Sequence, residues 1–276
     1  MRVRFAKMHG LGNDFMVVDW PQGRPAPEPD AVRRLADRRL GVGFDQLLLV
    51  TPAADGEHEA AYRIFNADGG EVEQCGNGAR CIARFVAAQG RQRDGELTLA
   101  STAGPIEARI GADGQVSVNL GVPDFAPASL PFRAPEERDR YVVHASGRDV
   151  ELGAVSIGNP HAVLLVDSVD TADVGILGAV LATHPDFPRG VNVGFLEIVR
   201  PDRVRLRVYE RGVGETPACG TAAAAAVAVG RRWGALAEQV DVELRGGVLT
   251  VRWPGPGRPL WQTGPTTLVY EGVIEL

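Results

Sequence analysis

An internal repeat constrains the fold of this chain more than any other feature of its sequence. The segment FNADGGEVEQCGNGA, which begins at Phe65, aligns with YERGVGETPACGTAA, which begins at Tyr209, at an offset of 144 residues. The shift places Gly70-Glu71 on Gly214-Glu215 and Cys75-Gly76 on Cys219-Gly220. Ordered matches at one spacing are typical of a duplicated structural unit, so we expect two similar halves.

Two further pairs extend the repeat at an offset of 146 residues. Gly12-Asn13 falls on Gly158-Asn159, and Gln46 falls on Asn192, another side-chain amide. The alternative is coincidence in a glycine-rich chain, but chance does not readily keep several matches in order. The predicted halves are residues 1–121 with 265–276, carrying Cys75, and residues 122–264, carrying Cys219. Between them, four prolines in residues 122–140 predict a linker or an exposed loop.

Hydrophobic alternation predicts many short strands and few helices. Arginine alternates with Val204, Leu206 and Val208, the pattern of a half-buried strand. The run AAAAAVAV in the second strong helix is apolar on every side and predicts a fully buried helix with a curled sheet around it. The expected strands are 14–19, 46–50, 60–66, 96–101, 105–110, 115–120, 161–167, 191–199, 203–210, 239–244, 248–253 and 267–276; the expected helices are 77–89 and 221–233, with weaker ones near 30–40 and 173–183.

Composition excludes several classes of function. The net charge of −6 and the absence of a basic tract argue against a nucleic-acid partner. No apolar run reaches the ~18 residues of a membrane span, and the first residues lack the apolar core of a signal peptide. With only three cysteines, the chain does not resemble a secreted disulfide scaffold. We expect a cytoplasmic protein with reduced thiols.

Cofactor chemistry finds little support in the sequence. Lys7 is the only lysine, and it lies in no glycine-rich phosphate site, so a pyridoxal Schiff base is disfavoured. No complete dinucleotide or P-loop motif is present. The five histidines are scattered and no Cys-x-x-Cys occurs, which disfavours a metal site. The prediction is therefore no cofactor and no metal.

Cys75 and Cys219 each lie immediately before a predicted helix. Amide groups and the positive end of a helix dipole would lower the pKa of a thiol there and could bind a carboxylate. Two repeat-related thiols facing one cavity could remove the α-proton of an amino acid from one face and return a proton to the other. The alternative, that buried cysteines are merely small hydrophobic residues, suits Cys81, which has no counterpart in the second half.

These residues carry a resemblance to the diaminopimelate epimerase family along nearly the whole chain. The chain resembles that family in seven ordered segments: HGLGNDF from His9, GVGFDQ from Gly41, FNADGGEVEQCGNGARC from Phe65, STAG from Ser101, GNPH from Gly158, NVGF from Asn192 and YERGVGETPACGT from Tyr209.

The resemblance implies an α+β fold of two pseudosymmetric domains, each a mostly antiparallel barrel-like sheet around a central helix. It implies interconversion of LL- and meso-2,6-diaminopimelate without pyridoxal phosphate or metal, in a cleft between the domains. The last strand would return to the first domain, and the family likeness suggests a homodimer.

The resemblance also implies roles for individual residues. Cys75 and Cys219 would be the acid and base, and His161 and Glu210 would tune their pKa values. The residues implied to bind substrate are Asn13, Gln46, Asn66, Gly76, Asn77, Asn159, Asn192, Glu210, Arg211, Gly220 and Thr221. Taken singly, Asn13 and Asn159 could instead be turn residues, and Glu210-Arg211 a solvated ion pair.

Two positions depart from the family pattern, and two other kinds of protein remain alternatives. Ala222 stands where glycine is common, and Gln74 lies in a variable place. A proline-racemase-like enzyme would also use two thiols, whereas phenazine-type isomerases lack the thiol pair. A non-catalytic amino-acid binding protein could use the same pocket but would not need two thiols at helix starts.

Overall fold

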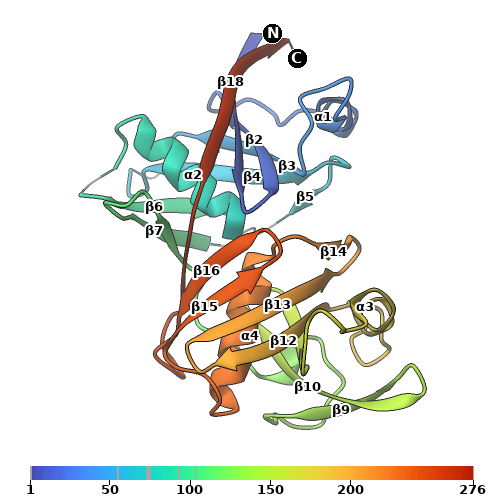
Figure 1. Ribbon diagram of the computed structural model, residues 1–276. Helices are drawn as coiled ribbons and strands as arrows, with labels where there is room; N and C mark the ends of the chain where they lie inside the picture. The colour runs from blue at the N-terminus through green and yellow to red at the C-terminus, as the bar shows by residue number, and fades with distance from the viewer. Residues whose placement is uncertain (1, 55, 73–75, 93, 103, 276) are drawn as a thin grey trace. The chain divides into compact units, whose positions relative to one another are not determined.

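The chain divides into two compact units in a computed structural model, which describes residues 2–54, 56–72, 76–92, 94–102 and 104–275 (Figure 1). Unit 1 comprises residues 1–119 and 263–276, and unit 2 comprises residues 120–262. Among the described residues, none of the helices has the length and apolar character needed to cross a membrane.

The described residues of unit 1 form two helices and a sheet of short strands. Its elements in chain order are β1 (Arg2–Gly10), β2 (Asn13–Asp19), α1 (Pro29–Ala36), β3 (Gln46–Thr51), β4 (Ala60–Asn66), β5 (Glu71–Val72), α2 (Gly76–Ala88), β6 (Glu96–Ser101), β7 (Gly104–Ile110), β8 (Val116–Asn119) and, at the end of the chain, β18 (Thr267–Glu275). The last strand pairs with the first, β1, in antiparallel fashion.

Unit 2 repeats this order. Its elements are η1 (Pro127–Ser129), β9 (Tyr141–Ala145), β10 (Arg148–Ser156), β11 (Pro160–Leu165), α3 (Val174–Ala182), β12 (Asn192–Arg200), β13 (Arg203–Glu210), β14 (Gly214–Thr216), α4 (Gly220–Arg232), β15 (Gln239–Leu244), β16 (Gly247–Arg252) and β17 (Trp261–Gly264), which runs past the boundary of the unit.

Strand pairing follows one scheme in both units. In unit 1, β2 and β3 are parallel, β3–β4 and β4–β5 are antiparallel, and β4–β6 is parallel. In unit 2, the pairs β11–β12, β12–β13, β13–β14 and β13–β15 have the same orientations in the same order. The remaining strand pairs within the units are mostly antiparallel. The duplicated sequence therefore folds into a duplicated topology.

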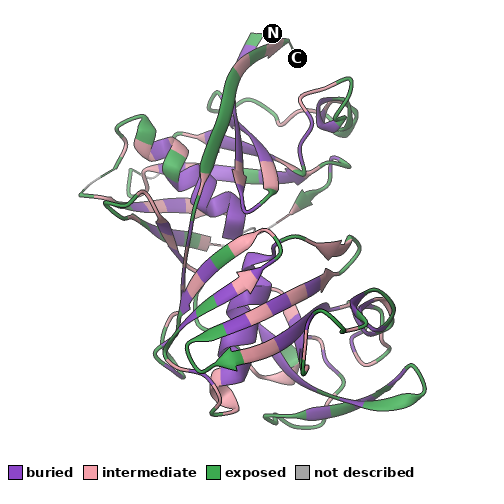
Figure 2. Cartoon of the chain, in the orientation of Figure 1, coloured by how far each residue is buried: buried purple, intermediate pink, exposed green. Residues whose placement is uncertain are grey.

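A central helix is packed against the strands of each unit. Helix α2 contacts β1, β2, β3, β6, β7 and β8, and α4 contacts β10, β11, β12, β13 and β16. Every residue of α4 from Gly220 to Gly230 is buried, as its all-apolar sequence predicts (Figure 2). Small alanine side chains let the surrounding strands approach this helix closely. The predicted fold class, two pseudosymmetric α+β domains with barrel-like sheets around central helices, is confirmed.

The proline-rich segment 122–140 is mostly an exposed loop, as the sequence predicts, but it also contributes side chains to the core of unit 2. Leu130 is fully buried and Phe132 is 8% exposed, and both belong to the hydrophobic core of unit 2. The Phe132 ring stacks on Phe187 with a centroid separation of 4.4 Å. Prolines fix the backbone dihedral φ, but they do not prevent neighbouring apolar side chains from packing. The segment is therefore an exposed loop that is anchored in the core of unit 2 by Leu130 and Phe132.

Strands β1, β9 and β10, and the short strands β5, β14 and β17, were not predicted from the sequence. Strand β1 carries Arg2, Arg4 and Lys7, and β10 begins with Arg148 and Asp149, so charged residues weaken the apolar signal. Their pairing is set by long-range partners: β1 lies between β2 and β18, and β10 between β9 and β11. Context of this kind determines strand formation more than intrinsic preference does.

Candidate functional site

The predicted site residues of unit 1 lie at one edge of its sheet. Asn13 begins β2, Gln46 begins β3 and Asn66 ends β4. Since β2 and β3 are parallel, their first residues lie at the same edge. Gln46 pairs directly with Asn66 in the antiparallel register of β3 and β4. Strand register thus brings together three side-chain amides that are far apart in the sequence.

Hydrogen bonds connect these amides to each other and to α2. The Gln46 Nε2 atom donates to Asn66 Oδ1 over 2.9 Å, and Asn77 Nδ2 donates to Asn13 Oδ1 over 3.3 Å. The Gln46 Oε1 atom is buried and has no hydrogen-bond partner among the described residues. A buried acceptor of this kind is uncommon in native proteins, and a bound ligand with a donor group would satisfy it.

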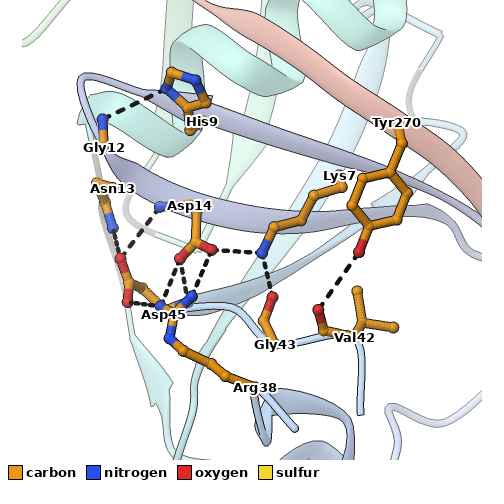
Figure 3. Close-up of polar contacts among 10 residues, drawn as sticks. All are labelled: Lys7, His9, Gly12, Asn13, Asp14, Arg38, Val42, Gly43, Asp45 and Tyr270. Atoms are coloured by element: carbon orange, nitrogen blue, oxygen red, sulfur yellow. Dashed lines mark hydrogen bonds and ion pairs between the residues drawn. The ribbon is translucent and has the colours of Figure 1, made fainter.

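An ion cluster supports the same edge of the sheet, and the sequence prediction missed it (Figure 3). Arg38 donates to both Asp14 and Asp45, and Lys7 donates to Asp14 and to the Gly43 carbonyl. Burial alone would raise the pKa of the Asp14 carboxyl, but the hydrogen bonds and charges of Arg38 and Lys7 hold it well below its usual range. Asp14 therefore stays ionised at neutral pH.

The start of α2 is described from Gly76 onward, and Cys75 lies outside the described residues. Gly76 and Asn77 are both buried in the first turn of the helix. Arg80, in the same helix, is fully buried and donates from Nη2 to Asn77 Oδ1 over 2.7 Å. Cys81 is a buried, reduced cysteine in this helix, consistent with its interpretation as an ordinary core residue.

Unit 2 arranges its predicted site residues at the equivalent edge. Asn192 begins β12, Glu210 ends β13 and Asn159 immediately precedes β11. His161 pairs with Asn192 in the parallel register of β11 and β12. Cys219 is the N-cap residue of α4, with φ −125° and ψ 117°. The sequence prediction that Cys219 directly precedes a helix is correct.

The environment of Cys219 raises its pKa, contrary to the expectation from the helix dipole. The residue is only 7% exposed, and burial, followed by the charge of Glu210, raises the pKa of the thiol well above that of a solvated cysteine. The hydroxyl of Thr221, 3.5 Å from Sγ, and the backbone N–H of Ala222 lower the pKa, but by less. The helix terminus is visible in the sequence, whereas the desolvation of the thiol depends on the packing around it.

His161 is neutral at physiological pH. It is 1% exposed, and burial, together with the nearby charge of Arg211, lowers its pKa to about 3. Its Nε2 atom lies 2.9 Å from Asn159 Oδ1, so this nitrogen carries the proton and donates to the amide oxygen. The Asn159 Nδ2 atom then faces Thr221 Oγ1 at 3.5 Å. Asn159, His161, Thr221 and Cys219 form one connected polar group.

Glu210, Arg211 and Asn192 form a second group at this edge. The Arg211 backbone N–H donates to Asn192 Oδ1 over 2.9 Å, and Thr216 donates to Glu210 Oε1 over 2.5 Å. The Arg211 guanidinium donates from Nη1 to the Arg189 carbonyl over 2.7 Å. The Nη1 end of that guanidinium is thus bonded to the backbone, so fewer than all of its N–H groups remain to bind a ligand carboxylate.

Gln262 is a further residue that the sequence prediction missed. It is fully buried, and its Nε2 atom donates to the Gly220 carbonyl over 2.6 Å at the start of α4. No sequence pattern marks it, because it lies 42 residues from its partner. Its contact fixes the backbone next to Cys219.

A cavity of about 840 Å³ in unit 2 lies away from these groups. Its lining includes Ser146, Asp149, Asp167 and Thr171, and it contains none of the predicted site residues. Its walls carry no cysteine or histidine.

Solved structures of several enzymes share the fold of the chain at low sequence identity. A hydroxyproline epimerase from Agrobacterium vitis is 19% identical, with a TM-score of 0.72 over 100% of this chain and 93% of that one. A phenazine biosynthesis protein of the PhzF family from Bacillus anthracis is 18% identical, with a TM-score of 0.70 over 100% of both chains. A probable proline racemase from Agrobacterium radiobacter is 18% identical, with a TM-score of 0.68 over 99% of this chain and 92% of that one.

The sequence itself matches a family model over most of its length. The model describes diaminopimelate epimerase and matches residues 5–126 and 153–269. These ranges include both cysteine motifs and every predicted site residue. The chain therefore belongs to the diaminopimelate epimerase family.

Proposed function

We propose that this protein interconverts LL- and meso-2,6-diaminopimelate by a cofactor-independent two-thiol mechanism. The observation that carries the proposal is Cys219, a reduced and buried thiol at the N-cap of α4, which is buried from Gly220 to Gly230, next to a connected group of polar side chains. Cys75 is proposed as its partner from its repeat-related position in the sequence.

The raised pKa of Cys219 suits the role of proton donor in a pair of catalytic thiols. A thiol that keeps its proton at neutral pH can donate that proton to a carbanion, and the second cysteine would act as the thiolate base. In the reverse direction the two roles exchange. Glu210 raises the pKa of Cys219, so we assign to Glu210 a tuning role. His161, neutral and donating to Asn159, is proposed to tune the thiols by holding the polar group that ends at Thr221.

Backbone amides at the helix starts suit the reacting carboxylate. Removal of the α-proton moves charge into that carboxylate, and N–H groups at a helix terminus stabilise it. We propose Gly76, Asn77, Gly220 and Thr221 as the residues that hold it, since they form the first turns of α2 and α4.

The remaining polar groups suit the second amino-carboxylate of diaminopimelate. The Gln46 Oε1 atom, for which no described residue supplies a hydrogen bond, and the carboxylate of Glu210 can accept from an ammonium. Arg211 can donate to a carboxylate. Asn13, Asn66, Asn159 and Asn192 are proposed to complete this pocket. A substrate without a second polar end would leave such groups unpaired and would be selected against. We place the reaction in the cytoplasm, where thiols remain reduced.

Isotope exchange with purified protein tests the proposal directly. The protein is incubated with LL-diaminopimelate in deuterated buffer containing a reductant and a chelator, without pyridoxal phosphate. We expect deuterium at the α-carbon and formation of the meso isomer. L-Proline and trans-4-hydroxy-L-proline are assayed in parallel, because turnover of either instead of diaminopimelate would favour a proline-racemase-like enzyme.

Three cysteine variants separate catalysis from binding. We expect Cys75→Ala and Cys219→Ala to abolish inversion while the protein still binds diaminopimelate, and Cys81→Ala to serve as the matched control with inversion retained. Inversion that survives in Cys219→Ala would refute the two-thiol mechanism. Binding without inversion in the unmodified protein would favour a non-catalytic amino-acid binding protein.

A further inference from the structure

A chain of side-chain hydrogen bonds crosses the polar edge of unit 1. It starts at Arg80, whose Nη2 atom donates to Asn77 Oδ1 over 2.7 Å. The Asn77 Nδ2 atom donates to Asn13 Oδ1 over 3.3 Å, and Asn13 Nδ2 donates to Asp45 Oδ2 over 3.0 Å. Neither Arg80 nor Asp45 is among the residues that the sequence motifs assign to the substrate pocket.

The two ends of this chain fix the orientation of both asparagine amides. A guanidinium can only donate hydrogen bonds, so Asn77 must turn its oxygen toward Arg80. An ionised carboxylate can only accept, so Asn13 must turn its nitrogen toward Asp45. The central bond, from Asn77 nitrogen to Asn13 oxygen, agrees with both requirements. An amide flip at either asparagine would place like groups against each other at two contacts.

Both ends are held in place by neighbouring groups. Arg80 is fully buried, and a Cβ atom added to Gly10 would lie 3.3 Å from its Nη2 atom, so β1 packs closely against the guanidinium. Asp45 accepts from Arg38 Nη2 over 2.7 Å and from the Asp14 backbone N–H over 3.1 Å (Figure 3). Arg38 is in turn held by the Asp14 carboxylate.

We propose that Arg80 and Asp45 are positioning residues, which act on substrate binding by fixing the amide orientations of Asn77 and Asn13. This inference rests on the proposed function, in which these two asparagines line the diaminopimelate pocket. A ligand meets different groups on the two sides of an amide, so a fixed orientation keeps the hydrogen-bonding pattern of the pocket constant. The gain is preorganisation, which lowers the cost of binding.

A double-mutant cycle tests whether Asp45 acts through Asn13. We expect Asp45→Ala to raise KM and lower kcat/KM by about tenfold to a hundredfold, with a smaller change in kcat. In an Asn13→Ala background, Asp45→Ala should cause no further loss, because the residue through which it acts is gone. Asp45→Asn, which keeps an oxygen acceptor, should restore part of the loss. Independent, additive losses in the cycle would overturn the proposal.

The same cycle with Arg80→Met and Asn77→Ala tests the other end of the chain. If Arg80→Met does not fold, the Asp45 cycle still decides the question. Glu96→Gln is the matched control, because Glu96 forms an exposed ion pair with Arg109, 3.2 Å away in the same unit, and has no place in the chain of hydrogen bonds. Its kinetics should equal those of the unmodified protein.

A spectroscopic measurement keeps this inference separate from the proposed function. In protein labelled with ¹⁵N-asparagine, the side-chain amide resonances of Asn13 and Asn77 should shift in Asp45→Ala and stay unchanged in Glu96→Gln. This readout needs no substrate. Shifted resonances in a protein that does not turn over diaminopimelate would refute the proposed function alone, whereas unshifted resonances would refute the positioning role.

Discussion

The sulfur of Cys219, the N-cap residue of α4, lies 3.5 Å from the hydroxyl oxygen of Thr221, two residues further along in the first turn of that helix. The Asn159 side-chain nitrogen faces that same hydroxyl at 3.5 Å, so the hydroxyl can accept from Asn159 while it donates its own proton to sulfur. Donation to sulfur favours the thiolate and opposes the effects of burial and of Glu210. The protonation of Cys219 therefore depends on a balance among the Thr221 hydroxyl, the Ala222 backbone N–H, the Glu210 carboxylate and desolvation of the thiol.

Removal of the Thr221 hydroxyl should raise the pKa of Cys219 further. In a Cys75→Ala/Cys81→Ala background, where Cys219 is the only cysteine, Thr221→Val should slow alkylation at a given pH by about tenfold, the effect of losing one hydrogen bond to a charged group. The measurement is the pH dependence of the rate with a small alkylating reagent. Thr221→Ser keeps the hydroxyl and should be alkylated at the rate of the single-cysteine protein with Thr221 intact. Equal alkylation rates for Thr221→Val and Thr221→Ser would contradict a pKa-lowering role of the hydroxyl.

Neutralisation of Glu210 should move the same pKa in the opposite direction. The negative charge of Glu210 raises the pKa of Cys219, so Glu210→Gln should lower it and speed alkylation at neutral pH. The same single-cysteine background and reagent apply. As a control, Glu197→Gln changes a carboxylate that pairs with Arg205 on the same unit, and it should leave the rate unchanged. Slower alkylation of Glu210→Gln would contradict the prediction that the charge of Glu210 raises the pKa of Cys219.

Buried His161 should make the protein less stable in mild acid. The native pKa is about 3 and the ordinary value is 6.5, so between these values the unfolded chain takes up a proton that the native protein does not. Stability should therefore fall as the pH drops from 6.5 toward 3, by up to about 1.4 kcal/mol per pH unit from this group. Urea unfolding of His161→Gln across that range should show a shallower dependence.

The effect of His161 on the pH dependence of stability can be separated from those of Asp14 and of exposed histidines. Asp14 has a lowered pKa, so its contribution is present above its ordinary value of 3.8 and is lost only below it, at lower pH than most of the His161 effect. His144 is exposed, and His144→Gln provides the matched substitution at a surface site. A pH dependence that is identical in His161→Gln and the unmodified protein would rule out this role for His161.

Gly153 should be required for the close packing of β10 on α4. A Cβ atom at Gly153 would lie 2.4 Å from Val229 Cγ1 and 3.0 Å from Trp233 Cζ2. Gly153→Ala should therefore destabilise the protein by about 1–3 kcal/mol through overpacking. Gly194 in β12 is the control, because its added Cβ would meet nothing closer than Leu206 Cδ1 at 3.4 Å. The two variants are compared by chemical unfolding, and equal stability would contradict the packing argument.

Breaking the Lys7–Asp14 ion pair, the largely buried part of the ion cluster, should destabilise the protein. Asp14→Asn leaves Lys7, whose side chain is 10% exposed, without its carboxylate partner, at a cost of about 3 kcal/mol. Asp30→Asn removes an exposed partner of Arg33 and should cost about 0.5 kcal/mol or less. Urea unfolding of both variants provides the comparison. Similar losses in the two would mean that burial does not strengthen the Lys7–Asp14 pair.

The sequence by itself determined the duplicated topology and the positions of the main helices. The repeat relates segments such as those around Gln46 and Asn192, and both residues do begin equivalent strands, β3 and β12. The apolar run of α4 predicted its burial, since a helix that is apolar on every side has no face suited to water. Local pattern suffices for such features because they depend on residues close together in the chain.

Only the tertiary structure decided the ion cluster, the hydrogen-bond chain and the protonation of Cys219. Arg38, Asp14 and Lys7 meet because strand and loop packing brings distant residues together, and no local spacing encodes their contact. The helix start favours a thiolate at Cys219, whereas burial, which depends on everything packed around it, favours the thiol more strongly. Desolvation is a property of the whole fold, so its magnitude could not be obtained from the order of residues.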